Sequence, residues 1–270
     1  MCIAAFAWRS HPLYPFILLL NRDEYYSRPT KPAEWWEGGE IVGGRDEKAG
    51  GTWLACSRSG RVSFVTNVRE VRGVVGARSR GDLPVSIKAK LYGLQSKKIA
   101  LEFAQEVAEE ADLYGGFNLV LVDFCTSTML YVTNRQGEDK PSIKQVSPGI
   151  HVLTNATLDS PWPKAERLAH NFEELLSAYG SEEVDLRLIV EKLMIDSTKE
   201  ASMLPGVHPP EFEYQLSSIF VECDTPLGHY GTRSTSAVCF KVNEVVYFYE
   251  RYLAGDSWQE HSFSYQITDY

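Results

Sequence analysis

Short apolar runs separated by turn residues mark the beginning of the chain. Ile3–Trp8 is apolar, Arg9–Pro15 carries a serine, a histidine and two prolines, and Phe16–Leu20 is apolar again. Apolar runs of this length between turn residues are typical of buried strands. We therefore expect a hairpin that folds about the middle of Arg9–Pro15. This hairpin would set Cys2 roughly opposite Asn21–Arg22.

The same pattern predicts the other elements. Ile99, Phe103, Val107 and Ala111 recur at helical spacing, which indicates an amphipathic helix over Ile99–Ala111. Strands in runs with helices grouped between them favour the α+β class, with two packed antiparallel sheets covered by helices. The remaining expected helices are Val85–Leu94, Pro161–Tyr179 and Val184–Met194, and the remaining expected strands lie near Thr52 and at Val62–Thr66, Phe117–Asp123, Thr128–Thr133, Ile143–Val146, His151–Thr154, Ser218–Glu222, Thr235–Lys241 and Val245–Tyr252.

Composition bounds the domain count and the partners. With 270 residues, of which 44% are hydrophobic, the chain can bury a large core, and we expect one domain over residues 1–270. The polar stretch Asn134–Ser142 is interpreted as a hairpin loop and not as a linker. A net charge of −9 argues against a nucleic-acid partner. The basic residues Arg69, Arg72, Arg78 and Arg80 form either a solvated loop or, beside a nucleophile, a site that attracts an anionic substrate.

Cysteine usage and hydropathy bear on the compartment. The chain has 5 cysteines with no C-x-x-C spacing, which is typical of a reducing compartment and predicts neither a structural zinc site nor a covalently attached haem. No apolar run approaches the ~20 residues of a membrane span. Met1–Trp8 lacks the basic residues of a secretory signal. We expect a cytoplasmic protein without metal or cofactor.

Cys2 is the first candidate for chemistry, because it follows Met1 directly. Removal of Met1 would leave a thiol and a free α-amine on one residue. The amine, with a pKa near ~8, can accept the thiol proton, so such a residue is a nucleophile with its own base. The alternative is a small buried hydrophobic side chain. The polar residues Asn21–Glu24 follow the expected end of the second strand, where they form either a site beside Cys2 or an ordinary solvated strand exit.

These motifs together resemble a known family, the NRDE-motif or transport and Golgi organisation protein 2 family. The resemblance covers essentially the whole chain. It implies association with Golgi organisation, mitochondrial and lipid metabolism and haem trafficking. It also implies the fold of N-terminal nucleophile hydrolases, a four-layer αββα sandwich with Cys2 between the sheets. The matching segments are Asn21–Glu24, Gly43–Gly44, Gly50–Leu54, Thr66–Glu70, Leu153–Asn155 and Gly231–Ser234.

A more distant resemblance, to cholylglycine hydrolases and penicillin V acylases, implies roles for single residues. Cys2 is similar to their nucleophile and Asp23 to the aspartate near the α-amine. Asn67 and Asn155 match their two asparagines, and Arg233 matches a late arginine. Acyl transfer develops an oxyanion that amide N–H donors stabilise. The resemblance therefore implies Asn67, and then Asn155, as donors, and Arg233 as a fixed charge or carboxylate binder.

The chain departs from those hydrolases at one position. Their early arginine precedes the asparagine, whereas Arg22 follows Asn21, so that Leu20 occupies the matching place. Because neighbouring strand residues point to opposite faces, the resemblance leaves open whether Arg22 reaches the thiol. Without the resemblance, either asparagine is equally well a turn residue, and Arg233 a surface residue at a strand entrance.

Two functions follow as expectations. The first is an N-terminal cysteine amidohydrolase acting on a linear amide or thioester of a hydrophobic acyl group. The second is a non-catalytic carrier of lipid or haem that retains the hydrolase scaffold. In both cases the partner is a hydrophobic small molecule, and Trp35 and Trp36, expected in a loop, are either core residues or the wall of an apolar pocket. The family resemblance adds mitochondrial or Golgi association to the cytoplasmic expectation.

Overall fold

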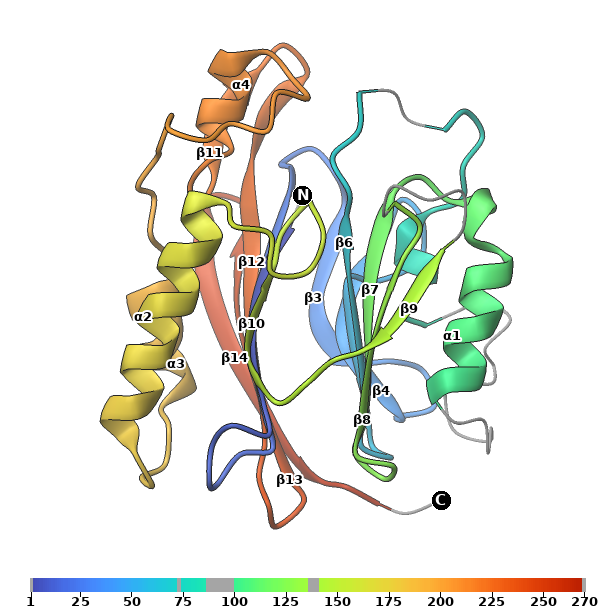
Figure 1. Cartoon of the computed structure of the whole chain (residues 1–270), viewed down its shortest axis with the longest axis vertical. Coiled ribbons are helices and arrows are strands. Elements are labelled where there is room, and N and C mark those ends of the chain that lie inside the picture. Colours follow the sequence, from blue (N-terminus) through green and yellow to red (C-terminus); the bar gives the residue numbers. More distant parts are fainter. Residues whose placement is uncertain (1, 72–73, 86–99, 136–140, 269–270) are drawn as a thin grey trace. The chain divides into compact units, whose positions relative to one another are not determined.

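A computed structural model describes residues 2–71, 74–85, 100–135 and 141–268. The chain divides into two compact units (Figure 1). Unit 1 is Met1–Ser27 with Pro148–Tyr265, and unit 2 is Arg28–Ser147 with Gln266–Tyr270. Each unit is built on one antiparallel sheet, of 7 strands within the described residues. The expected α+β class with two antiparallel sheets is confirmed, and the expectation of one domain stays a prediction.

The sheet of unit 1 has the order β10-β1-β2-β12-β13-β14, with β11 paired to β12. Helices α2 and α3 pack on one face of this sheet (Figure 1). The elements of unit 1 are β1 (Cys2–Trp8), β2 (Phe16–Tyr25), β10 (Gly149–Leu153), α2 (Pro163–Tyr179), α3 (Leu186–Leu193), α4 (Pro210–Gln215), β11 (Glu222–Thr225), β12 (Gly228–Phe240), β13 (Val245–Ala254) and β14 (Ser257–Gln266).

Strand alternation divides the core of unit 1. Ile3 and Ile17 point to the helix-covered face, where they join Leu168 and Phe172 of α2 and Ile189 of α3 in one hydrophobic cluster. Both central strands are also buried on their opposite face, which explains the continuous apolar runs Ile3–Trp8 and Phe16–Leu20. Burial on both faces means that any charge placed in these strands must find its partner inside the protein.

The sheet of unit 2 is a meander in chain order from β3 to β9. Helix α1 packs on β7, β8 and β9, and its buried Phe103 and Val107 confirm the helical stripe. The expected helix at Val85–Leu94 falls mostly outside the described residues. The elements of unit 2 are β3 (Thr30–Trp35), β4 (Ile41–Asp46), β5 (Leu54–Ser57), β6 (Arg61–Asn67), the short 3₁₀ turns η1 (Arg80–Asp82) and η2 (Ala111–Leu113), α1 (Ala100–Glu109), β7 (Phe117–Asp123), β8 (Thr128–Thr133) and β9 (Ser142–Gln145).

The polar residues after Leu20 do not leave the strand, so the expected strand end is wrong. β2 continues to Tyr25, because β12 pairs with it along its whole length, from Phe240 opposite Phe16 to Tyr230 opposite Tyr25. Similarly, β12 begins at Gly228 and not at Thr235, so Arg233 lies within the strand instead of at its entrance.

The expected strand Ser218–Glu222 is also wrong, since β11 begins only at Glu222. Side chains from elsewhere take the backbone carbonyls of this segment. Lys164 Nζ donates to the carbonyls of Leu216 and Ser218, and Asn21 Nδ2 donates to that of Ile219. With these acceptors occupied, the segment forms bends instead of a ladder.

Candidate functional site

Cys2 and Arg22 lie directly opposite each other at one end of unit 1. The β1–β2 register pairs Cys2 with Arg22 and Ile3 with Asn21. Side chains of directly opposed residues in an antiparallel pair lie on the same face, about 4.5–5.5 Å apart at Cβ. Arg22 therefore shares its face with the Cys2 side chain, whereas Asn21 points to the helix-covered face. Both Cys2 and Arg22 are buried.

Opposing influences act on the Cys2 thiol. Burial raises the pKa of Cys2, and the charge of Asp23 adds to the increase. The positive charge at the amino terminus, the Arg22 guanidinium and a hydrogen bond from the Asp23 backbone lower the same pKa. The net pKa is raised, so the thiol is neutral at pH 7 in a chain that still carries Met1. A change in the cationic surroundings is therefore required to form a thiolate.

Asp23 is a buried carboxyl on the helix-covered side of β2. Its Oδ1 accepts a hydrogen bond of 2.7 Å from Thr232 Oγ1. Burial raises the pKa of Asp23 overall, although the amino terminus, Lys164, Thr232 and Arg22 each lower it. Asp23 thus lies within electrostatic reach of the amino terminus, as an aspartate that orients an α-amine must.

Lys164 and Thr232 were not identified from the sequence. Lys164 lies in the first turn of α2, only 3% exposed, and donates to the carbonyl of Leu216 at 2.8 Å. Thr232 Oγ1 both donates to Asp23 and accepts from the backbone N–H of Val221 at 2.9 Å. A lysine among the apolar positions of a helix was the available signal for the first. Thr232 gave no signal beyond its place in the segment Gly231–Ser234.

Tyr230 is a further residue that the sequence did not reveal. Its hydroxyl donates to the backbone carbonyl of Asp23 at 3.1 Å, and its ring packs edge-on against Tyr25. Burial raises the pKa of Tyr230 well above its usual value, and the nearby charges of Asp23 and Glu24 raise it further. Tyr230 is therefore a neutral phenol that fixes the backbone next to the thiol.

Arg233 occupies a β-bulge. Thr232 pairs with Asp23 and Ser234 pairs with Arg22, so Arg233 is the extra residue between them. Its Nη1 donates to the carbonyl of Tyr25 at 3.2 Å. Burial lowers the pKa of Arg233, and the nearby Arg22 lowers it further. A bulge re-aims a side chain relative to the regular alternation, and here it brings a second guanidinium close to Arg22.

Asn21, the first residue of the Asn21–Glu24 motif, has a structural task. Its Nδ2 donates to the carbonyls of Met194 and Ile219 at 2.8 and 3.0 Å. Its Oδ1 accepts from Thr235 Oγ1 at 2.6 Å. The fully buried amide therefore ties β2 to the end of α3 and to the segment before β11, and it faces away from the Cys2 side chain.

The two asparagines expected in the site belong to different units. Leu153 pairs with Ala4, so Asn155 and Cys2, each two residues beyond that pair, lie at the same end of the β1–β10 pair. Asn155 is buried. Asn67 is the last residue of β6 in unit 2, paired with Phe117. Its expected role as an oxyanion donor stays a prediction.

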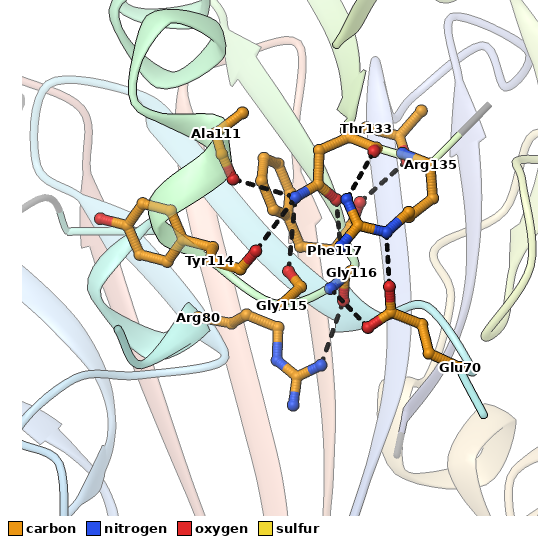
Figure 2. Close-up of polar contacts among 10 residues, drawn as sticks. Glu70, Arg80, Ala111, Tyr114, Gly115, Gly116, Phe117, Thr133 and Arg135 are labelled. Carbon is orange, nitrogen blue, oxygen red and sulfur yellow. Dashed lines mark hydrogen bonds and ion pairs between the residues drawn. The ribbon is translucent and has the colours of Figure 1, made fainter. Parts of the chain in front are cut away.

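Glu70, the last residue of the segment Thr66–Glu70, belongs to a polar network around the turn before β7 in unit 2 (Figure 2). Glu70 Oε2 accepts from the backbone N–H of Gly116 at 3.0 Å, and Glu70 Oε1 pairs with Arg135 Nε. Arg80 Nη1 donates to the carbonyl of Gly116 at 3.1 Å. Asn134 links the same turn, since its Oδ1 accepts from Phe117 N at 2.9 Å. Glu70 and Arg80 thus stabilise the turn before β7.

The other polar and aromatic candidates of unit 2 also have local partners. Arg78 pairs with Glu110 at 3.1 Å, and Arg72 lies outside the described residues. Trp35 ends β3 instead of lying in a loop, and the Arg58 guanidinium lies 3.9 Å from the centre of its ring. Arg45 lies 4.2 Å from the ring of Trp36, whose Nε1 donates to the carbonyl of Gly43 at 2.9 Å. A substrate-binding role for the tryptophans stays a prediction.

The described residues hold neither a metal-binding cluster nor a disulfide. No group of three or more His, Cys, Asp or Glu side chains there is arranged to hold a metal ion. The cysteines Cys2, Cys56, Cys125, Cys223 and Cys239 are all free thiols. Within the described part of the chain, no helix has the length and apolar character needed to cross a membrane.

Comparison with known proteins gives the family and the fold. In structure, the chain is similar to a mutant form of the conjugated bile acid hydrolase from Clostridium perfringens, with a TM-score of 0.53 and 9% identity over 99% of this chain and 97% of that one. This likeness shows the fold of N-terminal nucleophile hydrolases and nothing of the activity. In sequence, the mouse transport and Golgi organization 2 homolog is 34% identical over 93% of this chain and 92% of its own length.

Further matches agree. The human transport and Golgi organization protein 2 homolog is 33% identical, again over 93% of this chain and 92% of its own length. The family model described as Transport and Golgi organisation 2 matches residues 1–255, which include the Cys2 strand, the Asn21–Glu24 motif and the Arg233 bulge. This chain belongs to the transport and Golgi organisation 2 family.

Proposed function

We propose that this protein is an N-terminal cysteine amidohydrolase that cleaves a linear amide or thioester of a hydrophobic acyl group. The observation that supports it is the burial of Arg22 and Asp23 beside Cys2, in a strand whose first five residues are all apolar. Burying charge without need is costly, so buried charges at one strand end favour a chemical role over a purely structural one.

The first step is removal of Met1. It moves the positive charge from the Met1 nitrogen to the nitrogen of Cys2 itself. The amino terminus already lowers the pKa of the Cys2 thiol against the effect of burial, so a closer ammonium lowers it more. The same charge lowers the pKa of Asp23 and favours its ionised form, which then orients the ammonium. Processing thus activates both groups at once.

Acyl transfer then follows from these groups. The α-amine accepts the Cys2 proton, the thiolate attacks the substrate carbonyl, and the protonated amine gives its proton to the leaving nitrogen or sulfur. Water, deprotonated by the same amine, attacks the thioester and releases the acid. Arg22, opposite Cys2, stabilises negative charge on the thiolate and on the developing oxyanion. Asn155 is the donor that the strand register supports, and Asn67 rests on the resemblance alone.

The local charge bears on the substrate. Arg22, Arg233 and Lys164 lie at one end of the unit 1 sheet, together with two carboxyl groups, the buried Asp23 and the neighbouring Glu24. An excess of positive charge favours a substrate that carries a carboxylate, such as an N-acyl amino acid, over a neutral amide. Burial and the neighbouring Arg22 lower the pKa of Arg233, so an anionic partner would stabilise its charged form.

One observation favours the alternative function, a carrier of lipid or haem. In the chain that carries Met1, burial keeps the Cys2 thiol neutral, which is the state of a structural thiol. The hydrolase therefore requires a chain that has lost Met1, whereas the carrier does not. The proposal also places the protein in the reducing cytoplasm, with organelle association as in the names of its relatives, in accord with its free thiols.

The deciding experiment offers acyl donors to the processed protein. N-acyl amino acids, acyl amides and acyl-CoA thioesters are incubated with protein whose mass shows loss of Met1, and the products are followed by intact mass and chromatography. We expect a covalent acyl adduct on Cys2 or turnover of the donor. Cys2→Ala should abolish both, and Asn155→Ala should slow turnover by ~10²-fold, the effect of losing one oxyanion donor.

A labelling experiment supplies the control. Limiting iodoacetamide at pH 6–7 should alkylate Cys2 of the processed chain faster than Cys239, whose pKa burial raises to about 12. The same protein with Met1 retained should label slowly at Cys2. Absence of adduct and turnover, together with saturable lipid or haem binding that persists in Cys2→Ala, would establish the carrier and refute the hydrolase.

A further inference from the structure

A cavity lies in unit 1, away from the site around Cys2. It has a volume of about 420 Å³ and is lined by residues from the α2–α3 connection, the end of β12 and the strands β13 and β14. Ile17 pairs with Ala7 on one side and Cys239 on the other, five residues along β2 from Arg22. At ~3.3 Å per residue this separates the cavity from Cys2 by about 17 Å. The volume is in the range of sites for small molecules.

Tyr14 presents a hydrogen-bond donor to this cavity. The side chain is 1% exposed, and its hydroxyl oxygen accepts from the backbone N–H of Val184 at 3.1 Å. Because that bond occupies a lone pair, the O–H hydrogen must point elsewhere. Among the described residues it has no acceptor, and Tyr14 lines the cavity. A buried hydroxyl without an acceptor costs free energy that a ligand oxygen would recover.

Lys241 supplies the matching charge. Its ammonium pairs with the Glu183 carboxylate at 2.5 Å, and both residues line the cavity. The Lys241 side chain is 13% exposed, whereas that of Glu183 is 73% exposed. Burial raises the pKa of Tyr14 while the positive charge of Lys241 lowers it, so the two donors lie within electrostatic reach of each other. The exposed Glu183 carboxylate thus pairs with the Lys241 ammonium only weakly, and a ligand carboxylate can take its place.

The remaining lining residues suit an apolar body. Tyr247 and Tyr249 come from alternate positions of β13, so their rings lie on the same face of the sheet. Two acidic groups near the cavity have local partners. Asp185 accepts from the Leu188 N–H at the start of α3, and Glu260 pairs with Arg187 at 2.9 Å. The charge of Glu260 is therefore paired with a cation, and one oxygen of Asp185 is occupied by a backbone donor.

The geometry points to a binding site for a small monocarboxylate with an aromatic or aliphatic body. One carboxylate oxygen accepts from Tyr14 Oη, the other takes the Lys241 ammonium in place of Glu183, and the body packs on Tyr247 and Tyr249. A carboxylate offers two acceptor oxygens to these two donors, which a neutral amide cannot match. Such a site is suited to hold a carboxylic acid away from the thiol, as a product or an effector.

Titration calorimetry with octanoate and 4-phenylbutyrate, and with their primary amides, tests this site in the full chain. We expect the acids to bind at least tenfold more tightly than the amides. Tyr14→Phe should weaken acid binding about tenfold, the equivalent of one hydrogen bond of ~1.4 kcal/mol. Lys241→Met should weaken it as much or more. Glu183→Gln should tighten it, because this variant removes the competing carboxylate.

Two controls keep the result interpretable. Cys2→Ala should bind the acids as the wild type does, which separates this site from the hydrolase proposal. Glu183→Gln is a gain of binding that misfolding cannot imitate. Equal affinity for acids and amides, no tightening in Glu183→Gln, loss of binding in Cys2→Ala, or no binding of either acid at about 10 mM, a concentration that excludes even millimolar Kd values, would each overturn the inference.

Discussion

The polar residues that end β2 and those that end β6 form two different kinds of structure. After the end of β6, Glu70 accepts from the backbone of Gly116 and pairs with Arg135 beyond β8, so its charge is compensated within unit 2. At the end of β2, burial raises the pKa of Asp23 despite several cationic neighbours. The contacts of Glu70 stabilise a turn. Those of Asp23 leave a buried carboxyl group with a raised pKa in the residue next to Arg22, which faces the Cys2 thiol.

A similar difference exists within the segment Asn21–Glu24, whose residues have different surroundings. Within Asn21–Glu24, strand alternation sends Asn21 to the helix-covered face, where it bonds three partners, and sends Arg22 to the face of Cys2. Adjacent motif residues therefore need not share a function. If this interpretation holds, substitutions at the two strand ends should separate activity from stability.

The largest effect is expected for Asp23→Asn. Loss of the carboxylate that orients the Cys2 ammonium should lower turnover by roughly 10²–10⁴-fold, the scale of a lost general acid–base arrangement. The amide can still accept from Thr232, so the fold should persist. Steady-state kinetics of the processed protein measures the turnover, and thermal unfolding measures the stability of the fold. A variant that turned over at the wild-type rate would remove Asp23 from the mechanism.

The same variant makes a prediction about pH. In the chain that carries Met1 the folded pKa of Asp23 is raised, so the folded state binds more protons than the unfolded state, and this chain loses stability as pH rises from about 4 to the folded pKa. Asp23→Asn lacks this loss. Its stability relative to the wild type should therefore increase with pH across that window. Urea unfolding at pH 4, 5.5 and 7 checks it, and a constant difference would contradict the raised pKa.

Asn21→Ala should follow, with a loss of about 3–5 kcal/mol in the free energy of unfolding. It leaves the carbonyls of Met194 and Ile219 and the hydroxyl of Thr235 without their buried partner, and it opens a cavity. Denaturant unfolding measures the loss. Leu18→Ala, in the same strand without a polar contact, calibrates the cavity contribution alone, and an equal loss in both variants would show that the hydrogen bonds contribute little.

Gly116→Ala should cost about 1–3 kcal/mol, because a Cβ there lies 2.8 Å from the Glu70 carboxyl carbon and displaces it. Gly115→Ala is the matched control, since its Cβ would meet its nearest atoms at 3.9 Å, an ordinary contact. The two variants differ by one position in the same turn. Equal unfolding midpoints would mean that the Glu70 contact does not stabilise the turn.

The smallest effect is expected for Glu110→Gln, which removes the charge from the exposed pair with Arg78. The side chains of this pair are 49% and 35% exposed, so solvent screens their attraction and the loss should be about 0–1 kcal/mol. Thermal unfolding at low and high salt measures it. A loss as large as that of Gly116→Ala would show that the basic residues of this region contribute more than an ordinary surface pair.

Much of the local structure could be predicted from the sequence. Continuous apolar runs between turn residues gave β1, β7 and β8 with the bounds within a residue, since a strand buried on both faces must be apolar throughout. The turn composition of Arg9–Pro15 placed Cys2 opposite Arg22, because a hairpin pairs residues equidistant from its turn. These are short-range constraints, and they are contained in the sequence.

Elements that depend on a distant partner could not be predicted in this way. β2 extends to Tyr25 because β12, some two hundred residues later, supplies hydrogen bonds for its polar end. The same pairing creates the bulge that brings Arg233 to Arg22. In the sequence, Lys164 is an ordinary charged residue of an amphipathic helix. In the structure it is buried near Asp23, where its ammonium donates to the carbonyls of Leu216 and Ser218.

The sequence by itself therefore determined the strands that are buried on both faces, the register of the first hairpin and the candidate residues at its end. Only the tertiary structure decided which of these polar residues face the thiol, which tie the backbone together, and which charges are buried. The physical reason is that the energy of a polar side chain is set by its hydrogen-bond partners and its distance from water. Neither quantity exists until segments far apart in the chain have packed together.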